Sequence, residues 1–235
     1  MKISSKDNPL VKYLVRLYEN KKERDESNKF IVEGYNLVSE AKKQGLLDKV
    51  FSIKEEDDYK DAIIVTQDII KKITNTVTPE GIIAICNKKK DLNLGNKVLY
   101  LDSLQDPGNI GTLLRSAIAF NFDTVVLDEC VDLYNPKVIR ASQGAIFYLN
   151  ILSNSLSELK SLGYKIIGTE MFGTALNNYK SNDSKLVLIL GNEGHGVRSE
   201  YLEFSDINLT IPMNSIESLN VGVAGSILMY ELNKK

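Results

Sequence analysis

The stretch LVLILGNEGHG, residues 186–196, decides the fold class. Its first five residues are all apolar, and a strand without polar residues is typical of a parallel sheet that is covered on both faces. A glycine-rich loop follows at once, at the carboxyl end of this strand, where open α/β sheets bind their ligands. The stretch therefore predicts a buried strand of an α/β protein with a candidate ligand loop directly after it.

Apolar periodicity on both sides of this stretch predicts a longer alternation of strands and helices. In the second half of the chain we expect strands over 98–101, 124–127, 164–169, 186–190 and 207–211, with helices over 109–120, 136–142, 155–162 and 218–232. In the first half we expect strands over 30–32, 50–53, 62–65 and 81–86, with helices over 8–21, 34–44 and 68–73. The lysine-rich stretch 88–95 separates the two series. The sequence thus predicts two domains, residues 1–94 and residues 95–235, and a parallel sheet in the second.

Composition excludes several classes of protein. With 235 residues, 43% of them hydrophobic, the chain has enough apolar surface to form a core and is not a disordered sequence. No apolar run approaches the ~20 residues that span a bilayer, so we expect no membrane association. Two distant cysteines, Cys86 and Cys130, predict free thiols in the reducing cytoplasm. The single histidine, His195, rules out a histidine-rich metal site, and we expect no metal.

Charge gives one weak pointer to a partner. The net charge is −2, so the chain is not strongly basic overall. Basic side chains nevertheless gather on and just after the first predicted helix, at Lys12, Arg16, Lys21, Lys22 and Arg24. A phosphate-binding arm and a solvated helix face both explain this pattern, and charge alone leaves the two open.

Three polar segments follow predicted strands in the second half, and the first covers residues 106–115. Asn109 stands where a helix cap belongs, and Arg115 lies about one and a half turns inside the same helix. An arginine in that position projects toward the helix amino terminus, which is a natural anion site. A surface salt bridge is the alternative explanation of Arg115.

The second and third segments cover residues 191–197 and 211–221. In the second, the glycines are spaced GxxGxG, the reverse of the GxGxxG order that cradles a pyrophosphate, and Glu193 would repel a phosphate. The loop favours a cationic or hydroxyl-bearing ligand over a dinucleotide, unless it is only a tight connection. In the third, Ser218 and Asn220 open the last predicted helix, and Ser218 is the expected cap.

Together the three segments resemble the SpoU/TrmH family of RNA ribose 2′-O-methyltransferases, of the SPOUT class. The family motif N-x-G-x-x-x-R is matched by Asn109, Gly111 and Arg115. G-x-E-x-x-G is matched by Gly191, Glu193 and Gly196, and S-L-N-V by residues 218–221. The resemblance covers about residues 97–235, with a loop at 214–217 that is one residue shorter than is usual. More weakly, residues 30–34 and 78–84 resemble the family's substrate-binding extension, a smaller N-terminal α/β domain similar to some ribosomal proteins.

The resemblance implies a deep trefoil knot in the C-terminal domain and a homodimer formed through that domain. Its activity would be methyl transfer from S-adenosylmethionine to a ribose 2′-hydroxyl of structured RNA, most simply ribosomal RNA. A tRNA methyltransferase, or a non-catalytic RNA-binding paralogue that kept the fold, are the alternatives. The implied catalytic residues are Arg115, Asn109, Glu193, Ser218 and Asn220. The implied cofactor contacts are Gly191, Ile211, Leu219, Met213 and Thr169. The charge pattern of the first helix, and not a family motif, gives the predicted RNA contacts Lys12, Arg16, Lys21, Lys22 and Arg24.

Overall fold

The computed structural model describes residues 2–90, 93–180, 183–216 and 218–234. The chain forms two compact units, Met1–Lys90 with Asp132–Phe147, and Asp91–Val131 with Tyr148–Lys235. None of the helices in the described ranges is long and apolar enough to cross a membrane.

The segment Asp132–Phe147 packs with the first unit, although the sequence placed it in the second domain. Aromatic packing and an ion pair hold the segment there. The ring of Phe30 packs against those of Tyr134 and Phe147, and Arg24 forms an ion pair with Asp132. The expected limits of 94 and 95 therefore do not describe the packing of this segment, and the assignment of functions to the two domains stays a prediction.

The first unit is built on a mixed sheet in the order β1-β4-β3-β5-β2. Its strands are β1 (Lys2–Ile3), β2 (Lys29–Glu33), β3 (Leu47–Ser52), β4 (Ile63–Val65) and β5 (Ile82–Asn87). β4 runs parallel to β1 and β3, whereas β5 runs antiparallel to β2 and β3. The helices of this unit are α1 (Pro9–Glu19), α2 (Lys21–Ser27), α3 (Tyr35–Lys43), α4 (Gln67–Thr74) and α6 (Pro136–Ser142), with short 3₁₀ turns at Asp57–Tyr59 and Ala145–Phe147.

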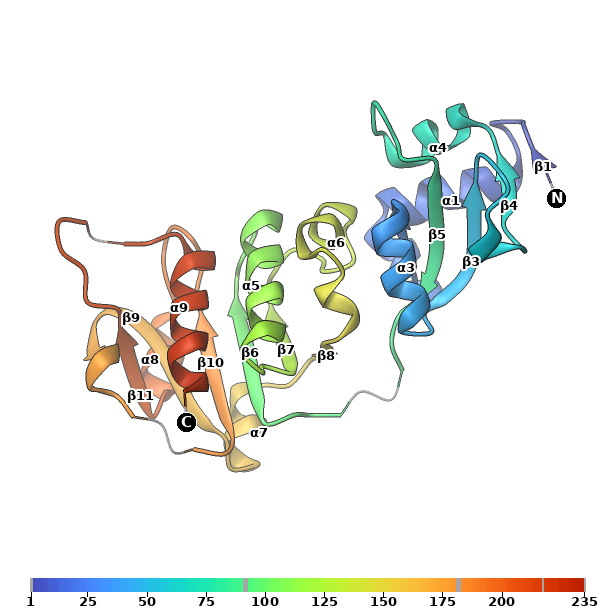
Figure 1. Ribbon diagram of the computed structural model, residues 1–235. Coiled ribbons are helices and arrows are strands. Elements are labelled where there is room, and N and C mark those ends of the chain that lie inside the picture. Colours follow the sequence, from blue (N-terminus) through green and yellow to red (C-terminus); the bar gives the residue numbers. More distant parts are fainter. Residues whose placement is uncertain (1, 91–92, 181–182, 217, 235) are drawn as a thin grey trace. The chain divides into compact units, whose positions relative to one another are not determined.

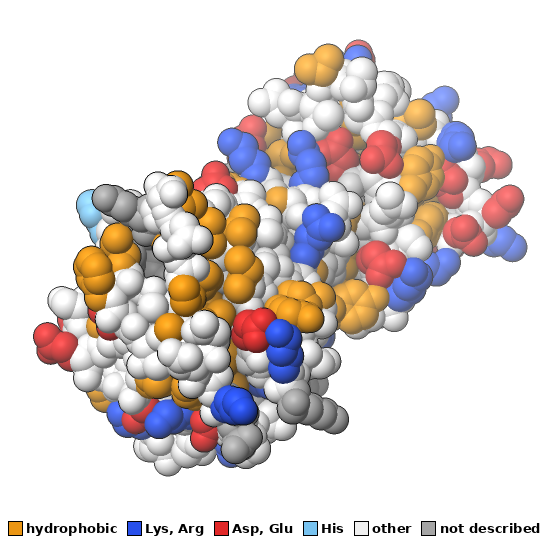
Figure 2. Space-filling view, turned by 60° about the vertical axis from the view of Figure 1, so that its left-hand side comes forward, with side chains coloured by type: hydrophobic (Ala, Val, Ile, Leu, Met, Phe, Trp, Pro, Cys, Tyr) orange, Lys and Arg blue, Asp and Glu red, His pale blue; other side chains and the backbone are white. Residues whose placement is uncertain are grey.

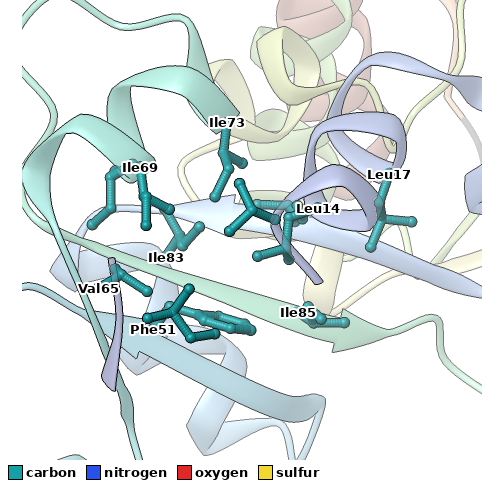
Figure 3. Packing of buried hydrophobic residues seen from close by; sticks show 12 residues of the cluster. Leu14, Leu17, Phe51, Val65, Ile69, Ile73, Ile83 and Ile85 are labelled. Carbon is teal, nitrogen blue, oxygen red and sulfur yellow. The ribbon is translucent and has the colours of Figure 1, made fainter. Parts of the chain in front are cut away.

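The core of the first unit forms where α1 and α4 pack onto this sheet (Figure 3). Leu14 and Leu17 of α1 meet Ile69 and Ile73 of α4 over the strands, and all four side chains are fully buried or nearly so. Burial of each such side chain contributes ~1.5–3 kcal/mol. Asn8 caps α1, where its side chain accepts a hydrogen bond from the backbone N–H of Leu10.

The second unit contains a six-stranded sheet in the order β11-β9-β10-β6-β7-β8, and all neighbouring strands are parallel. Its strands are β6 (Lys97–Asp102), β7 (Thr124–Asp128), β8 (Asn150–Leu152), β9 (Lys165–Ala175), β10 (Leu186–Leu190) and β11 (Ile207–Thr210). The helices are α5 (Pro107–Ala119), α7 (Leu156–Ser161), α8 (Ser199–Phe204) and α9 (Val221–Asn233), with a 3₁₀ turn at Leu176–Asn178. Every residue of β10 is buried, which confirms the predicted α/β class and parallel sheet.

Two helices lie side by side along this sheet, α5 and α9 (Figure 1). They approach closely because Gly225 of α9 has no side chain. A Cβ at this position would lie 2.4 Å from Leu113 of α5 and 2.5 Å from Leu190 of β10. The hydroxyls of Ser116 and Ser226 are hydrogen-bonded across the same contact at 2.7 Å. The last helix is thereby held against the strand that precedes the glycine loop.

The structure also differs from the predicted elements. The expected helix 8–21 is two helices, because Asn20 is extended and its side chain caps α2. β9 continues to Ala175, beyond the expected end at 169. β1, β8 and α8 were not expected, and the predicted linker 88–95 includes residues 91–92, which lie outside the described residues.

Candidate active site

The second unit contains a pocket of about 760 Å³ at the carboxyl ends of its central strands. A cavity of that size is in the range of small-molecule and cofactor sites. Its walls come from residues 169–172 of β9, residues 190–197 at and after the end of β10, and residues 209–211 and 213 around the end of β11. Asn109 of α5, residues 218–221 and the buried side of α9 complete them. All three polar segments therefore reach one cavity.

Most of the predicted site residues line this pocket. Of the five predicted catalytic residues, four are in its wall: Asn109, Glu193, Ser218 and Asn220. All five predicted cofactor contacts are there as well, namely Gly191, Ile211, Leu219, Met213 and Thr169. Arg115 is not in the wall. Of the shortened loop 214–217, residue 217 lies outside the described residues.

Asn109 connects the three segments through its side-chain amide. Its Nδ2 donates to Oε1 of Glu193 at 3.1 Å, and its Oδ1 accepts from Nδ2 of Asn220 at 2.8 Å. A carboxylate accepts hydrogen bonds and cannot donate one when ionised, which fixes the orientation of the Asn109 amide. The backbone N–H of Asp106 also donates to Oε1 of Glu193, at 3.3 Å. The glycine loop, the start of α5 and the start of α9 are thus hydrogen-bonded to one another.

The two helix caps differ from those predicted. Asp106, and not Asn109, caps α5, by accepting from the backbone N–H of Asn109 at 2.7 Å. Asn220, and not Ser218, caps α9, by accepting from the backbone of Gly222 at 2.9 Å. Because Asp106 satisfies the backbone of its helix, the side chain of Asn109 is left for the contacts with Glu193 and Asn220. Ser218 is exposed at the pocket.

Two glycines shape the loop after β10 for different reasons. At Gly191, a Cβ would lie 2.1 Å from the carbonyl carbon of Gly196, so the two ends of the loop could not approach. Gly196 itself has φ +72°, a backbone conformation that favours glycine. Asn192 and Gly196 exchange backbone hydrogen bonds at 3.0 and 2.9 Å, which closes the loop beside the pocket.

Side chains outside the predicted set anchor this loop to the sheet. Nδ2 of Asn192 donates to the carbonyl of Ser103 at 2.8 Å. Just after the loop, Nε of Arg198 donates to the fully buried carboxylate of Asp102 at 2.7 Å, and its Nη2 contacts Asp128. Burial lowers the pKa of Arg198, but the charges of Asp102 and Asp128 outweigh this and raise the pKa above its ordinary value. Neither anchor has a motif that a single sequence reveals.

Arg115 is exposed on α5. Its guanidinium makes no hydrogen bond or ion pair with any residue in the described ranges, so the alternative of a surface salt bridge is not what the structure shows. An exposed guanidinium with all its donors free suits a ligand that comes from solvent, such as a phosphate.

The chemistry of the wall fits S-adenosylmethionine better than a nucleotide with a pyrophosphate. The described residues that line the pocket include two carboxylates, Glu170 and Glu193, and no lysine or arginine. Negative side chains attract a sulfonium and an ammonium group and repel phosphate. Apolar side chains from Leu190, Ile211 and Leu228 offer a surface for a purine. Sequence reasoning missed Glu170, because it ended the strand before this residue.

One predicted RNA contact is wrong. Arg24 is only 2% exposed and forms an ion pair with Asp132 at 2.8 Å, while its Nη1 donates to the carbonyls of Leu17 and Tyr18. A side chain enclosed in this way cannot reach a phosphate. The other four predicted contacts, Lys12, Arg16, Lys21 and Lys22, are exposed.

Comparison with known proteins agrees with the geometry of the second unit. Residues 96–230 match the model of the SpoU rRNA Methylase family, and residues 8–84 match that of the MRM3-like substrate binding domain. The chain belongs to the SpoU rRNA methylase family. The resemblance and the activity expected from it, an S-adenosylmethionine-dependent RNA 2′-O-methyltransferase, are thereby confirmed.

Several relatives match this family member over nearly its whole length. The 23S rRNA (guanosine(2553)-2′-O)-methyltransferase RlmP of Bacillus subtilis is 38% identical over 98% of both chains. Among solved structures, the AdoMet-bound rRNA methyltransferase from Sinorhizobium meliloti superposes with a TM-score of 0.87 at 25% identity, covering 99% of this chain and 97% of that one. An RNA 2′-O ribose methyltransferase gives a TM-score of 0.78 at 30% identity, covering 99% and 98%.

Proposed function

We propose that this SpoU-family enzyme methylates the ribose 2′-hydroxyl of a guanosine in 23S rRNA. The hydrogen bonds that join Asn109, Glu193 and Asn220 at the mouth of one pocket are the observation that carries the proposal, because they bring the three family motifs into one site. The RlmP relative supports the choice of 23S rRNA over tRNA and indicates guanosine 2553 as the first nucleotide to examine.

The residues that would hold the cofactor are Thr169, Gly191, Ile211, Met213 and Leu219 in the pocket wall. S-adenosylmethionine supplies a methyl group on a sulfonium, which already has a good leaving group. The protein must therefore orient the ribose hydroxyl toward that methyl and lower the cost of removing its proton.

Arg115 is proposed to bind the phosphate next to the target ribose. Its free, exposed guanidinium offers paired donors to phosphate oxygens, and its positive charge stabilises an alkoxide developing nearby. An arginine side chain keeps its proton at neutral pH, so it is a poor general base. We therefore assign it electrostatic stabilisation and positioning.

Glu193 is proposed to bind the ribose 2′-hydroxyl by accepting its hydrogen bond. Its Oε1 already accepts from Asn109 and from the backbone of Asp106, and these contacts hold the carboxylate in place. Its Oε2 has no hydrogen bond within the described ranges and is available to accept one from the ribose. Ser218 and Asn220 complete this side of the pocket.

The first unit is proposed to bind the RNA, as its match to a substrate-binding domain supports. Four exposed basic residues, here called the basic arm, would contact phosphates: Lys12, Arg16, Lys21 and Lys22. Some of their charge is offset locally, because Arg16 pairs with Glu23 at 3.1 Å and Lys22 with Glu26 at 3.7 Å. Exposed pairs of this kind are weak and give way readily to a phosphate.

The second unit is proposed to form the homodimer, in the cytoplasm where its rRNA substrate is made. Exposed apolar side chains follow the outer side of α5 and α9, at Ile118, Val223, Ile227 and Tyr230. Figure 2 shows hydrophobic side chains gathered on the forward face of this unit. A contiguous apolar surface is typical of a protein interface. Light scattering after size exclusion tests this proposal, and a monomeric mass at micromolar concentration would contradict it.

We also propose that this unit carries the trefoil knot of the SPOUT class. Two features support it. β10 lies between β9 and β6, out of chain order, and the chain returns from the edge strand β11 to place α9 against α5.

Mapping of 2′-O-methyl groups in 23S rRNA, from cells with and without this gene, tests the main proposal. We expect one guanosine to lose its methyl group when the gene is deleted and to regain it on complementation. An unchanged 23S rRNA map, with a lost site in tRNA, would contradict it.

A further inference from the structure

The long strand β9, which lies between the edge strand β11 and β10, carries a projecting segment beside the active-site pocket. Asn208 of β11 pairs with Gly168 of β9, but the next residue, Leu209, pairs with Thr174. Residues 169–173 of β9 therefore lie between two successive partners on β11. We call residues 169–173 the β9 flap. An insertion of this kind re-aims side chains at the edge of a sheet, often next to an active site.

The flap is fixed at both ends and in its middle. Oγ1 of Thr169 donates to the carbonyl of Ile189, and Oγ1 of Thr210 donates to the carbonyl of Met171, both at 3.0 Å. At Gly173, a Cβ would lie 2.4 Å from the carbonyl oxygen of Asn208, so only glycine allows this close approach. These contacts hold the backbone of the flap in a single conformation.

The most exposed large apolar side chain on this flap is a phenylalanine at the pocket. Phe172 is 92% exposed and Met171 is 52% exposed, and both are among the residues that line the cavity. The same cavity is lined by Asn109, Glu193 and Asn220. A held backbone that presents a bare aromatic ring to solvent, at the rim of a reaction site, is typical of a stacking platform.

We propose that Phe172 is the stacking platform for the nucleobase of the target nucleotide. This inference rests on the proposed function. In a nucleotide, the base is attached to C1′, which is bonded to the C2′ that carries the reacting hydroxyl. A hydroxyl seated among Glu193 and Asn220 therefore leaves its own base within a few ångströms of the pocket rim. Unpaired RNA bases stack readily on exposed aromatic side chains.

Two other occupants fit the observations less well. Leu190, Ile211 and Leu228 offer the cofactor purine an apolar wall inside the pocket, whereas Phe172 projects into solvent. A second copy of the chain has the apolar side of α5 and α9 available to it. The nucleobase fits best, because binding of the ribose 2′-hydroxyl in the pocket already brings the base to the rim.

The chain has no tryptophan, so Phe172→Trp in the full-length protein gives a single fluorescent reporter at this position. The probe is an unmethylated transcript of the 23S rRNA segment around the target guanosine. We expect the transcript to quench this tryptophan and S-adenosylmethionine alone to leave it unchanged. Leu162→Trp is the matched control, because it is an exposed apolar position of the same unit that does not line the pocket, and we expect no quenching there.

Enzyme kinetics provide a second, independent test. Phe172→Ala should raise the KM for the transcript ~10-fold, with the Kd for S-adenosylmethionine unchanged, and Phe172→Trp should keep KM near the wild-type value. Quenching by S-adenosylmethionine alone would overturn the inference in favour of the cofactor. A blue-shifted emission that depends on protein concentration, without RNA, would overturn it in favour of a partner copy. If the wild-type enzyme methylates the transcript and Phe172→Ala has a normal KM, only the inference fails, whereas no methylation by the wild type overturns the proposed function as well.

Discussion

Asn109 accepts a hydrogen bond from Asn220 and donates one to Glu193, so a single amide joins the start of α5, the start of α9 and the glycine loop. Glu193 lies 84 positions and Asn220 lies 111 positions from Asn109 in the sequence. The amide must keep its NH₂ toward the carboxylate and its oxygen toward Asn220. The site is thereby assembled through a side chain whose two ends have different partners.

This arrangement predicts that Asn220→Asp lowers turnover without lowering stability. The carboxylate still caps α9, but Asn109 then faces carboxylates on both sides and can donate to only one of them. We expect kcat to fall ~10-fold or more, the scale of a misplaced catalytic group. Asn220→Ala should lose the cap as well, at a cost of ~1 kcal/mol. Thermal unfolding and single-turnover methyl transfer measure the two effects, and normal turnover by Asn220→Asp would show that the amide does not organise the site.

The ion pair of Arg24 predicts a large loss of stability on substitution. Arg24→Ala leaves Asp132 with little exposure and no counter-charge, and breaking a buried pair in this way costs ~3–5 kcal/mol. Arg16→Ala is the control, because its pair with Glu23 is exposed and worth at most ~1 kcal/mol. Urea unfolding of both variants makes the comparison. Equal midpoints would mean that the Arg24 pair does not hold Asp132–Phe147 to the first unit.

The basic arm predicts a salt-dependent, sequence-independent contribution to RNA binding. Each phosphate contact that is lost should reduce the slope of log affinity against log salt by ~0.7–0.9. The double variant Arg16→Ala with Lys22→Ala should therefore show a flatter slope, and it should weaken all RNAs about equally. Lys49→Ala, an exposed lysine elsewhere in the first unit, serves as the control. If the double variant keeps the wild-type slope, the arm does not touch RNA.

The two thiols are predicted to be unreactive at neutral pH. Burial raises the pKa of Cys130 to about 11 and also raises that of Cys86. The thiolate is the reactive form, so at pH 8 the reactive fraction of Cys130 is roughly 200-fold below that of a free cysteine, whose pKa is ~8.5. Alkylation with iodoacetamide should be slow in the native enzyme, should accelerate toward pH 11, and should reach both residues after denaturation. Rapid labelling of the native enzyme at pH 8 would refute this.

Much of the fold follows from local sequence. The all-apolar run 186–190 and the helix 136–142 appear in the structure with the predicted bounds, because apolar periodicity and a proline or glycine at the ends act locally. The position of residues 132–147 could not be predicted, since it depends on the contacts of Phe30 and Arg24 with residues more than a hundred positions away. β8 and α8 are short and have little periodicity of their own.

The site was predictable only in part, for a similar reason. The motif residues were found because their order along the chain resembles that of a family, and nine of the ten predicted catalytic and cofactor residues line one pocket. The β9 flap and the anchor at Arg198 were not found. The β9 flap arises from the register between β9 and β11. The Arg198 anchor arises because Asp102 of β6 and Asp128 of β7 both contact the residue after the glycine loop. Neither feature leaves a pattern in a single sequence.

The most direct test of the account is methyl transfer by the purified enzyme to 23S rRNA from cells that lack the gene. With S-adenosylmethionine labelled in its methyl group, we expect the label to be recovered as 2′-O-methylguanosine after digestion of the rRNA. Arg115→Ala should lower kcat ~100-fold, the scale of one lost transition-state contact, while calorimetry shows unchanged affinity for the cofactor. Label on a base, no label at all, or full turnover by Arg115→Ala would contradict the account.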